Sequence, residues 1–290
     1  MSTLLDPGFA RELEALRRRL SLRARSGSGG ERIASRRGSS AEFLEHRPYA
    51  AGDDLRRMDW LAFARTGAPV LKLFRAEEDV VVRLVVDASG SLDFGDPPKL
   101  LVAKRLAAAI GYMALASSER AQVLTAGEGL VRVREPVRGR GALAALLREL
   151  DEVTASHGTD LARAIDAAVL RAERPGMLVV TSDFFDPGRF DDALGRAAAA
   201  GHDVALVQVL APEEIEPPWD GDLALEDAES GTTLDVTLDD RAAEAYRERL
   251  EGLFAMLRAT AKRLRAPYVR VKTDEPLLDA VRRFVSRAVD

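Results

Sequence analysis

Short apolar blocks alternate with longer amphipathic blocks over residues 79–290. The block Val80–Val86 is apolar at every position except Arg83, which is typical of a strand buried on both faces of a sheet. Comparable blocks predict strands at 121–125, 130–134, 177–181, 204–210 and 268–271, and amphipathic blocks predict helices at 100–117, 142–150, 161–172, 190–200, 242–264 and 276–288. This alternation predicts the α/β fold class, with a doubly wound, mostly parallel sheet covered by helices.

Residues 1–40 do not continue this alternation. Their helical pattern, carried by Leu13, Leu16 and Leu20, predicts an amphipathic helix, and Ser26–Gly30 predicts a flexible stretch after it. The stretch 11–40 holds nine Arg and three Glu. Because runs of like charge are usually solvated, we expect a basic, partly mobile arm.

Residues 41–78 form a second N-terminal segment. Gly52-Asp53-Asp54 predicts a turn, and Val70–Phe74 predicts a short strand. We expect this extension of short strands to pack on the main domain without a core of its own.

The acidic stretch 211–240 interrupts the main domain. It holds eleven Asp and Glu and no Lys or Arg, so we expect a solvated insertion, with one strand at 232–237. Trp219 lies in its polar part, and because Trp is enriched where proteins bind one another, it is a candidate partner contact.

The composition excludes several kinds of site. The 290 residues contain no Cys and three widely spaced His, which excludes thiolate chemistry and argues against a His-built zinc site. The net charge of −5 is not that of a nucleic-acid binder. No run of about 18 apolar residues and no signal-peptide pattern occurs, so we expect a cytoplasmic protein without a membrane span.

Carboxylates and hydroxyls gather after the predicted strands, where open α/β sheets bind their ligands. Asp87-Ala88-Ser89-Gly90-Ser91 follows the first strand, Ser182-Asp183 follows strand 177–181, and Gly158-Thr159 precedes helix 161–172. Hydroxyl and carboxylate oxygens without nitrogen or sulfur ligands suit a hard cation, Mg²⁺ or Mn²⁺. The predicted metal site consists of Asp87, Ser89, Ser91, Thr159 and Asp183.

A structural interpretation stands beside each of these residues. Asp87 and the two serines also fit an Asx turn with a helix cap, and Thr159 with Asp160 also fits a cap of the next helix. Phe184 and His157 lie beside the predicted ligands and are candidate partner contacts, or else a core residue and an ordinary loop residue.

The pieces Asp87-x-Ser89-x-Ser91, Gly158-Thr159-Asp160 and Asp183 resemble the metal-ion-dependent adhesion site of von Willebrand factor A domains. An upstream string resembles the signature of the domain-of-unknown-function 58 (DUF58) family, which carries a von Willebrand factor A-like, Rossmann-type domain after it. One residue departs from the family pattern, since Leu92 stands where members usually have Met. The matching signature residues are Arg47, Tyr49, Gly52, Asp53, Asp54, Arg56, Asp59, Trp60 and Arg65.

This resemblance implies a short member without the two membrane helices of longer members, and a MoxR-type AAA+ ATPase as partner. For the signature residues we favour a structural network, with Arg56 paired to a carboxylate and Trp60 docked on the domain, over a second functional surface.

Three functions are weighed. The first is a non-enzymatic binding module that presents Mg²⁺ to an acidic residue of a partner protein, as an adaptor or co-chaperone of the ATPase. The second is a Mg²⁺-dependent phosphohydrolase with Asp87 as nucleophile, although Ser89 stands where the related phosphatases have their general acid. The third is a binder of nucleic acid or anionic surfaces through Arg17–Arg37, which lacks interleaved aromatic residues. We expect the first.

Overall fold

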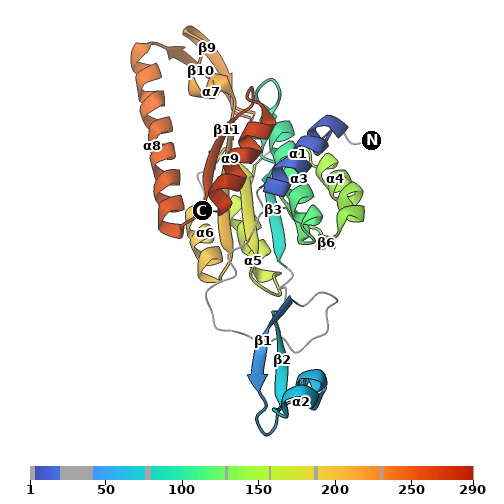
Figure 1. Ribbon diagram of the computed structural model, residues 1–290. Helices are drawn as coiled ribbons and strands as arrows, with labels where there is room; N and C mark the ends of the chain where they lie inside the picture. The colour runs from blue at the N-terminus through green and yellow to red at the C-terminus, as the bar shows by residue number, and fades with distance from the viewer. Residues whose placement is uncertain are drawn as a thin grey trace. The chain divides into compact units, whose positions relative to one another are not determined.

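Most of the described strands of residues 80–290 form one seven-stranded sheet in the computed structural model (Figure 1). The chain divides into two compact units, one of residues 1–27 with 80–290 and one of residues 28–79, and each is described by itself. The structure describes residues 4–19, 42–75, 80–127, 130–156, 158–185, 189–228 and 231–289.

The sheet of the larger unit has the strand order β11-β8-β7-β3-β4-β5. All neighbours from β11 to β4 run parallel, whereas β5 and β6 both pair antiparallel with β4. The sheet therefore confirms the predicted α/β fold class and its doubly wound, mostly parallel sheet. The strands are β3 (Val81–Asp87), β4 (Arg120–Gly127), β5 (Leu130–Val133), β6 (Val137–Arg138), β7 (Met177–Ser182), β8 (Asp203–Leu210) and β11 (Tyr268–Lys272).

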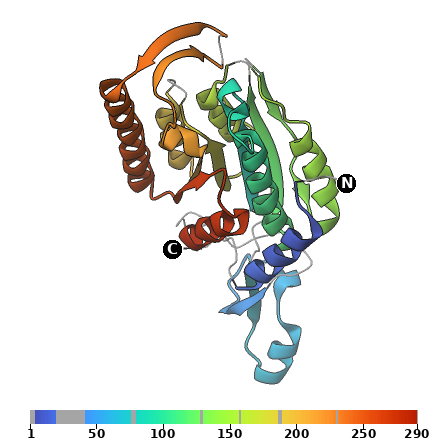
Figure 2. The ribbon, with the colours of Figure 1, turned by 90° about the horizontal axis from the view of Figure 1, so that it is seen from above.

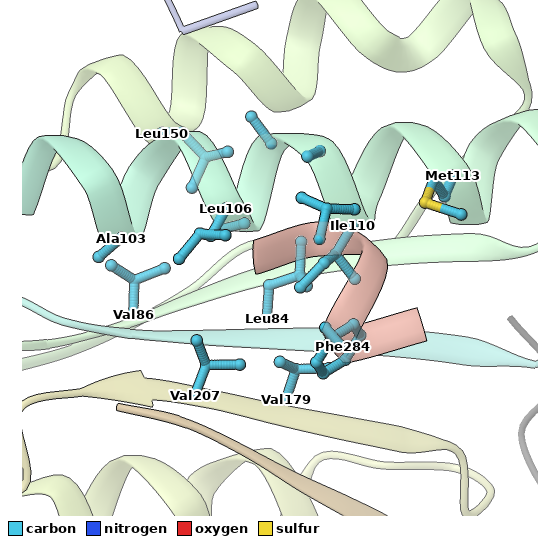
Figure 3. Close-up of a cluster of buried hydrophobic side chains, with 14 of the residues drawn as sticks. Leu84, Val86, Ala103, Leu106, Ile110, Met113, Leu150, Val179, Val207 and Phe284 are labelled. Carbon is cyan, nitrogen blue, oxygen red and sulfur yellow. The ribbon is translucent and has the colours of Figure 1, made fainter. Parts of the chain in front are cut away.

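Helices cover both faces of this sheet. On one face, strand residues such as Leu84 and Val179 pack with Ile110 of α3 and Phe284 of α9 (Figure 3). The opposite face is closed by α5, α6 and part of α8. The helices are α1 (Pro7–Arg19), α3 (Lys99–Ala116), α4 (Leu143–Asp151), α5 (Leu161–Leu170), α6 (Phe190–Ala199), α8 (Asp240–Leu264) and α9 (Leu277–Val289).

Helix α1 corrects part of the prediction for residues 1–40. The predicted helix is present, but it is not solvated: Leu13 and Leu16 are buried in the core on the α3 side of the sheet. Glu14 also accepts a hydrogen bond from the Tyr112 hydroxyl of α3 at 3.1 Å. The arginine run misled the prediction because a helix can carry several charged residues and still bury its apolar face. Residues 20–41, the rest of the predicted arm, lie outside the described residues.

The acidic stretch forms a short helix and a hairpin ahead of α8. Helix α7 (Pro212–Ile215) is followed by β9 (Gly221–Glu226) and β10 (Thr233–Leu238), which pair antiparallel with each other. The predicted strand at 232–237 is therefore β10. Its partner β9 was not predicted, because acidic residues break its apolar pattern.

The smaller unit contains the signature segment. Strands β1 (Glu42–Pro48) and β2 (Val70–Arg75) pair antiparallel, and α2 (Trp60–Thr66) follows a 3-10 turn at Leu55–Arg57. Strand β2 confirms the prediction for 70–74. Packing of this segment on the main domain stays a prediction.

Asp59 is the centre of the signature's polar contacts. It caps α2 by accepting from the Leu61 and Ala62 N–H groups, and its other carboxylate oxygen lies 2.9 Å from His46 Nε2. A second contact joins Arg47 to Asp53 at 2.6 Å. A structural network is therefore present around these residues.

One detail of the expected network is wrong. Arg56 contacts the Asp54 carboxylate through its backbone N–H, and its side chain is exposed. Within this unit the ring edge of Trp60 lies against Phe63, and docking of Trp60 on the main domain stays a prediction. The remaining signature residues take turn and surface positions: Tyr49 donates its N–H to Pro69, Gly52 has a φ of 104°, and Arg65 lies in the last turn of α2.

Within the described residues, no helix combines the length and the apolar character that a membrane crossing requires.

Candidate metal centre

The order in which the strands are added to the sheet reverses between β3 and β7, and the predicted ligands lie at that point. From β3 the chain continues to β4 on one side, whereas β7 pairs with the other side of β3. Such a switch point leaves a crevice at the carboxyl ends of the two strands, where ligands bind in this fold class. Asp87 is the last residue of β3, and Asp183 comes directly after β7.

Asp87 is a buried carboxylate whose partners are hydrogen-bond donors rather than cations. It is 1% exposed, and its two oxygens accept from the Ser182 hydroxyl at 2.5 Å and from the Ser89 N–H at 3.0 Å. Burial, with a further contribution from the nearby negative charge of Asp183, raises the pKa of Asp87 to about 6. A positive charge beside Asp87 would stabilise its ionised form.

Hydroxyl groups connect the two carboxylates. Ser89 Oγ lies 3.0 Å from Ser91 Oγ, and the Ser91 hydroxyl donates to Asp183 Oδ2 at 2.7 Å. The 3-10 turn Gly90–Asp93 directly after β3 brings Ser91 back toward Asp183. All three side chains therefore face one small volume at the edge of the sheet.

Thr159 supplies the fifth oxygen of the predicted set. Its hydroxyl is buried and forms no well-aligned hydrogen bond, yet it lies close enough to Asp87 to lower the pKa of that carboxyl. A buried hydroxyl without a partner is costly and uncommon, which marks a position where a further ligand fits. The structural role assigned to Asp160 is confirmed, because its carboxylate caps α5 by accepting from the Arg163 N–H at 2.8 Å.

The structure thus brings together Asp87, Ser89, Ser91, Thr159 and Asp183. In the described part of the chain, no three His, Cys, Asp or Glu side chains converge as a metal cluster. The donor set is instead two carboxylates with three neutral hydroxyls, which fits a hard divalent cation.

Sequence reasoning missed Lys99, which touches this site. Its side chain is 0% exposed, and Nζ lies 2.7 Å from Asp183 Oδ2 and 2.5 Å from Glu214 Oε1. A lysine at the first position of a helix is unfavourable because the N-terminal end of the helix carries partial positive charge. This unfavourable position is the sequence feature that could have identified Lys99 as a residue of the site.

Carboxylates outnumber ammonium groups among the described residues at this site. Asp87, Asp183 and Glu214 supply three carboxylates, and Lys99 supplies one ammonium group. Burial raises the pKa of Glu214, while the Lys99 charge acts in the opposite direction. With all groups ionised, the three carboxylates exceed the one ammonium group by two negative charges.

Aromatic side chains surround this edge of the sheet. Phe94, Phe185 and Trp219 are 41%, 39% and 45% exposed. The Phe94 and Trp219 rings meet edge to face with centroids 6.4 Å apart, and Lys99 Nζ lies 5.2 Å from the Phe185 ring centroid. We call these three residues the aromatic rim.

Phe184 and His157 are two of the residues predicted to contact a partner. Phe184 is 1% exposed and packs on Phe190 of α6, with ring centroids 5.3 Å apart, so the prediction that it contacts a partner is wrong. The two adjacent phenylalanines point to opposite environments, and the exposed one is Phe185. His157 lies outside the described residues.

Comparison with known proteins finds a matching family model and several relatives. The family model described as "Protein of unknown function DUF58" matches residues 45–255. The uncharacterized protein Rv1480 of Mycobacterium tuberculosis is 34% identical over 287 residues, which cover 97% of this chain and 90% of the relative. An uncharacterized protein of Mycobacterium avium, MAV169, is 36% identical over 126 residues, covering 43% of this chain and 74% of the relative.

Solved structures with similar backbones are more distant in sequence. The conserved hypothetical protein BatB from Bacteroides thetaiotaomicron has a TM-score of 0.45 at 20% identity, over 72% of this chain and 98% of its own. A von Willebrand factor type A protein from Catenulispora acidiphila has a TM-score of 0.46 at 15% identity, over 76% of this chain and 44% of its own.

Proposed function

The chain belongs to the DUF58 family, and from this premise we propose that it is a metal-dependent protein-binding module that presents Mg²⁺ or Mn²⁺ to an acidic residue of a partner protein. The observation that carries the proposal is the buried Asp87 carboxylate, 1% exposed, with hydroxyls around it and no cation paired with it in the described residues. Burying an unpaired charge is expensive, and a bound cation offsets that cost.

The residues at the sheet edge offer the ion two kinds of oxygen ligand. Ser89, Ser91 and Thr159 offer neutral oxygens, and Asp87 and Asp183 offer the charge. Neutral hydroxyl ligands do not cancel the charge of a divalent cation. The bound ion then supplies a positive charge that attracts a further anionic oxygen, which we assign to an Asp or Glu of the partner.

The aromatic rim supports a protein as the partner. Exposed aromatic residues are enriched where proteins bind one another, and these three lie beside a strongly polar centre. We propose an acidic residue flanked by apolar side chains as the feature recognised. The family resemblance adds a MoxR-type AAA+ ATPase as the partner that we propose, with this chain as its adaptor or co-chaperone.

Binding is favoured over phosphoryl chemistry by the surroundings of Asp87. A nucleophilic carboxylate needs an oxygen that can approach phosphorus. Here one Asp87 oxygen accepts from Ser182 and the other from Ser89, and the side chain is buried. Lys99, the cation nearest the site in the described residues, contacts Asp183 and Glu214 rather than Asp87. The interpretation as a binder of anionic surfaces depends mostly on residues 20–41, outside the described part.

A direct test starts with the ion alone. Mn²⁺ binding would be titrated by electron paramagnetic resonance for the wild type and for the Ser89→Ala/Ser91→Ala double variant. Ser117→Ala is the matched control, because Ser117 follows the far end of the 18-residue helix α3, about 27 Å from Lys99. We expect the wild type and control to bind and the double variant to lose binding.

The partner is tested by affinity capture from the protein's own cell lysate in Mg²⁺ and in EDTA, with mass spectrometry as the readout. We expect the wild type to capture a AAA+ ATPase in Mg²⁺ only, and the double variant to capture none. Equal capture under all conditions would contradict a metal-dependent module.

A further inference from the structure

Ala228, which lies just after β9, approaches the loop of the candidate metal centre. A Cβ atom added at Gly90 would lie only 2.3 Å from the Ala228 carbonyl oxygen and 3.0 Å from its carbon. Gly90 stands between Ser89 and Ser91, so the hairpin touches the part of the loop that connects two proposed ligands. Figure 2 shows the two strands arching over this end of the molecule from α8 toward α3.

Two further contacts join the acidic insertion to the same centre. Trp219, just before β9, packs edge to face on Phe94, which directly follows the 3-10 turn Gly90–Asp93. Glu214 of α7 contacts Lys99, which in turn contacts Asp183. The insertion therefore meets the centre at its beginning and at its hairpin turn.

Between these contacts the hairpin has little to hold it in place. Its strands pair with each other, and in the described residues neither joins the main sheet. Leu225 and Leu234 face each other across the two strands and are 48% and 63% exposed. An isolated two-stranded hairpin is marginally stable, and segments with few buried apolar contacts open at low free-energy cost. Few buried apolar contacts therefore oppose opening of the hairpin.

The charge of the insertion matches the partner that the centre is proposed to bind. Residues 211–240 hold eleven carboxylates and no Lys or Arg, and Glu226 and Asp227 lead directly into the residue that touches Gly90. An acidic segment beside the proposed cation site would compete with an acidic residue of a partner for access to the ion.

We propose that the β9–β10 hairpin is a built-in cover of the candidate metal centre, which an acidic partner displaces. This inference rests on the proposed function and adds its regulation. If the cover is closed nine-tenths of the time, the apparent affinity for the partner is about tenfold weaker than that of the open form.

Gly90→Ala is the sharpest probe of the cover. The added methyl group overlaps the Ala228 carbonyl, and neither Ser89 nor Ser91 is substituted. Gly90 is not among the glycines with positive φ, so alanine fits the backbone there. The matched control is Gly252→Ala on α8, where an added Cβ meets nothing within 4 Å.

The position of the hairpin can be read by spin labels, because the natural chain has no Cys to interfere. Nitroxides attached through Glu226→Cys on the hairpin and Leu170→Cys on α5, two exposed positions, give the distance between these elements by double electron–electron resonance. We expect Gly90→Ala to lengthen and broaden the distance distribution and Gly252→Ala to leave it as in the wild type. An unchanged distribution in Gly90→Ala would overturn the cover.

A second variant removes Gly221–Leu238 and joins the ends with a short glycine linker, so the conclusion does not depend on one substitution. Water proton relaxation per bound Mn²⁺ measures solvent access to the ion. We expect it to rise in both Gly90→Ala and the hairpin-free variant. Mn²⁺ binding with relaxation unchanged in both would overturn the cover and leave the metal site standing. Absence of Mn²⁺ binding in every variant would overturn the metal site and, with it, the role of the cover.

Discussion

The Nζ atom of Lys99 lies 2.7 Å from Asp183 Oδ2, and the two side chains are 0% and 2% exposed. The same ammonium group lies 2.5 Å from Glu214 Oε1, so one buried cation is shared by two carboxylates. In this arrangement Asp183 lies beside the Ser91 hydroxyl, whereas no cation among the described residues pairs with Asp87. Lys99 thus supplies part of the positive charge at the candidate metal centre, and the proposed metal ion supplies the rest.

Lys99→Met should destabilise the protein strongly. Breaking a buried ion pair by removing one partner leaves uncompensated charge and costs about 3–5 kcal/mol. Urea denaturation in EDTA measures this loss. Lys104→Met is the control, since Lys104 lies on the same helix and donates to the backbone carbonyls of Asp151 and Val153. We expect saturating Mg²⁺ to stabilise Lys99→Met more than the wild type. A loss below about 1 kcal/mol, the range of an exposed pair, would contradict a buried ion pair.

Thr159→Val should separate binding from stability. Valine keeps the shape of threonine and removes a buried hydroxyl that has no well-aligned partner, so the free energy of unfolding should stay equal or rise. Affinity for Mn²⁺ should fall by about tenfold or more, the size of effect seen when groups that support a metal site are removed. Thr260→Val, at a buried position of α8, is the control and should leave Mn²⁺ binding unchanged. Equal affinity in Thr159→Val and the wild type would exclude Thr159 as a ligand.

The sequence predicted the main sheet well because its strands are buried on both faces. Val81–Asp87 is buried at every position, and such a continuous apolar block has few alternative interpretations. The hydroxyls and carboxylates of the site could also be predicted, since their place after a strand is a local property of the chain. Strands β1 and β9 were missed because their polar residues leave no apolar period to detect.

The partners of Lys99 and the hairpin contact lay beyond sequence reasoning for a different reason. The Lys99 partners are 84 and 115 residues away in the chain, and nothing local to Lys99 specifies them. The approach of Ala228 to Gly90 likewise depends on how the insertion folds back over the sheet. The charge run of α1 was misjudged because charged residues between apolar positions at helical spacing do not exclude a buried apolar face.

Acid should weaken the smaller unit through Asp59. Hydrogen bonds from the Ala62 N–H and His46, with the charge of Lys72, lower the pKa of Asp59 to about 2 from 3.8. A carboxyl with a depressed pKa in the folded state contributes stability above its unfolded pKa, and this contribution is lost as the pH falls through the folded value. The expected window is therefore from about pH 4 down to about pH 2.

Amide NMR signals of α2, recorded on the full chain, measure this acid transition. Asp59→Asn should remove the pH dependence across that window, because asparagine does not titrate. Asp54→Asn, which alters an exposed carboxylate that accepts from the Arg56 N–H, is the control and should keep it. An identical acid transition in wild type and Asp59→Asn would show that another group controls it.

Substituting the two adjacent phenylalanines should separate folding from partner binding. Phe184 is 1% exposed and packs on Phe190, so Phe184→Ala should cost about 3–5 kcal/mol of stability. Phe185 is 39% exposed and belongs to the aromatic rim, so Phe185→Ala should leave the urea midpoint nearly unchanged and weaken Mg²⁺-dependent capture of the partner. Mn²⁺ affinity should persist in Phe185→Ala, because its ring is not among the proposed ligands. Full capture by Phe185→Ala would remove the aromatic rim from the binding surface while leaving the metal site untouched.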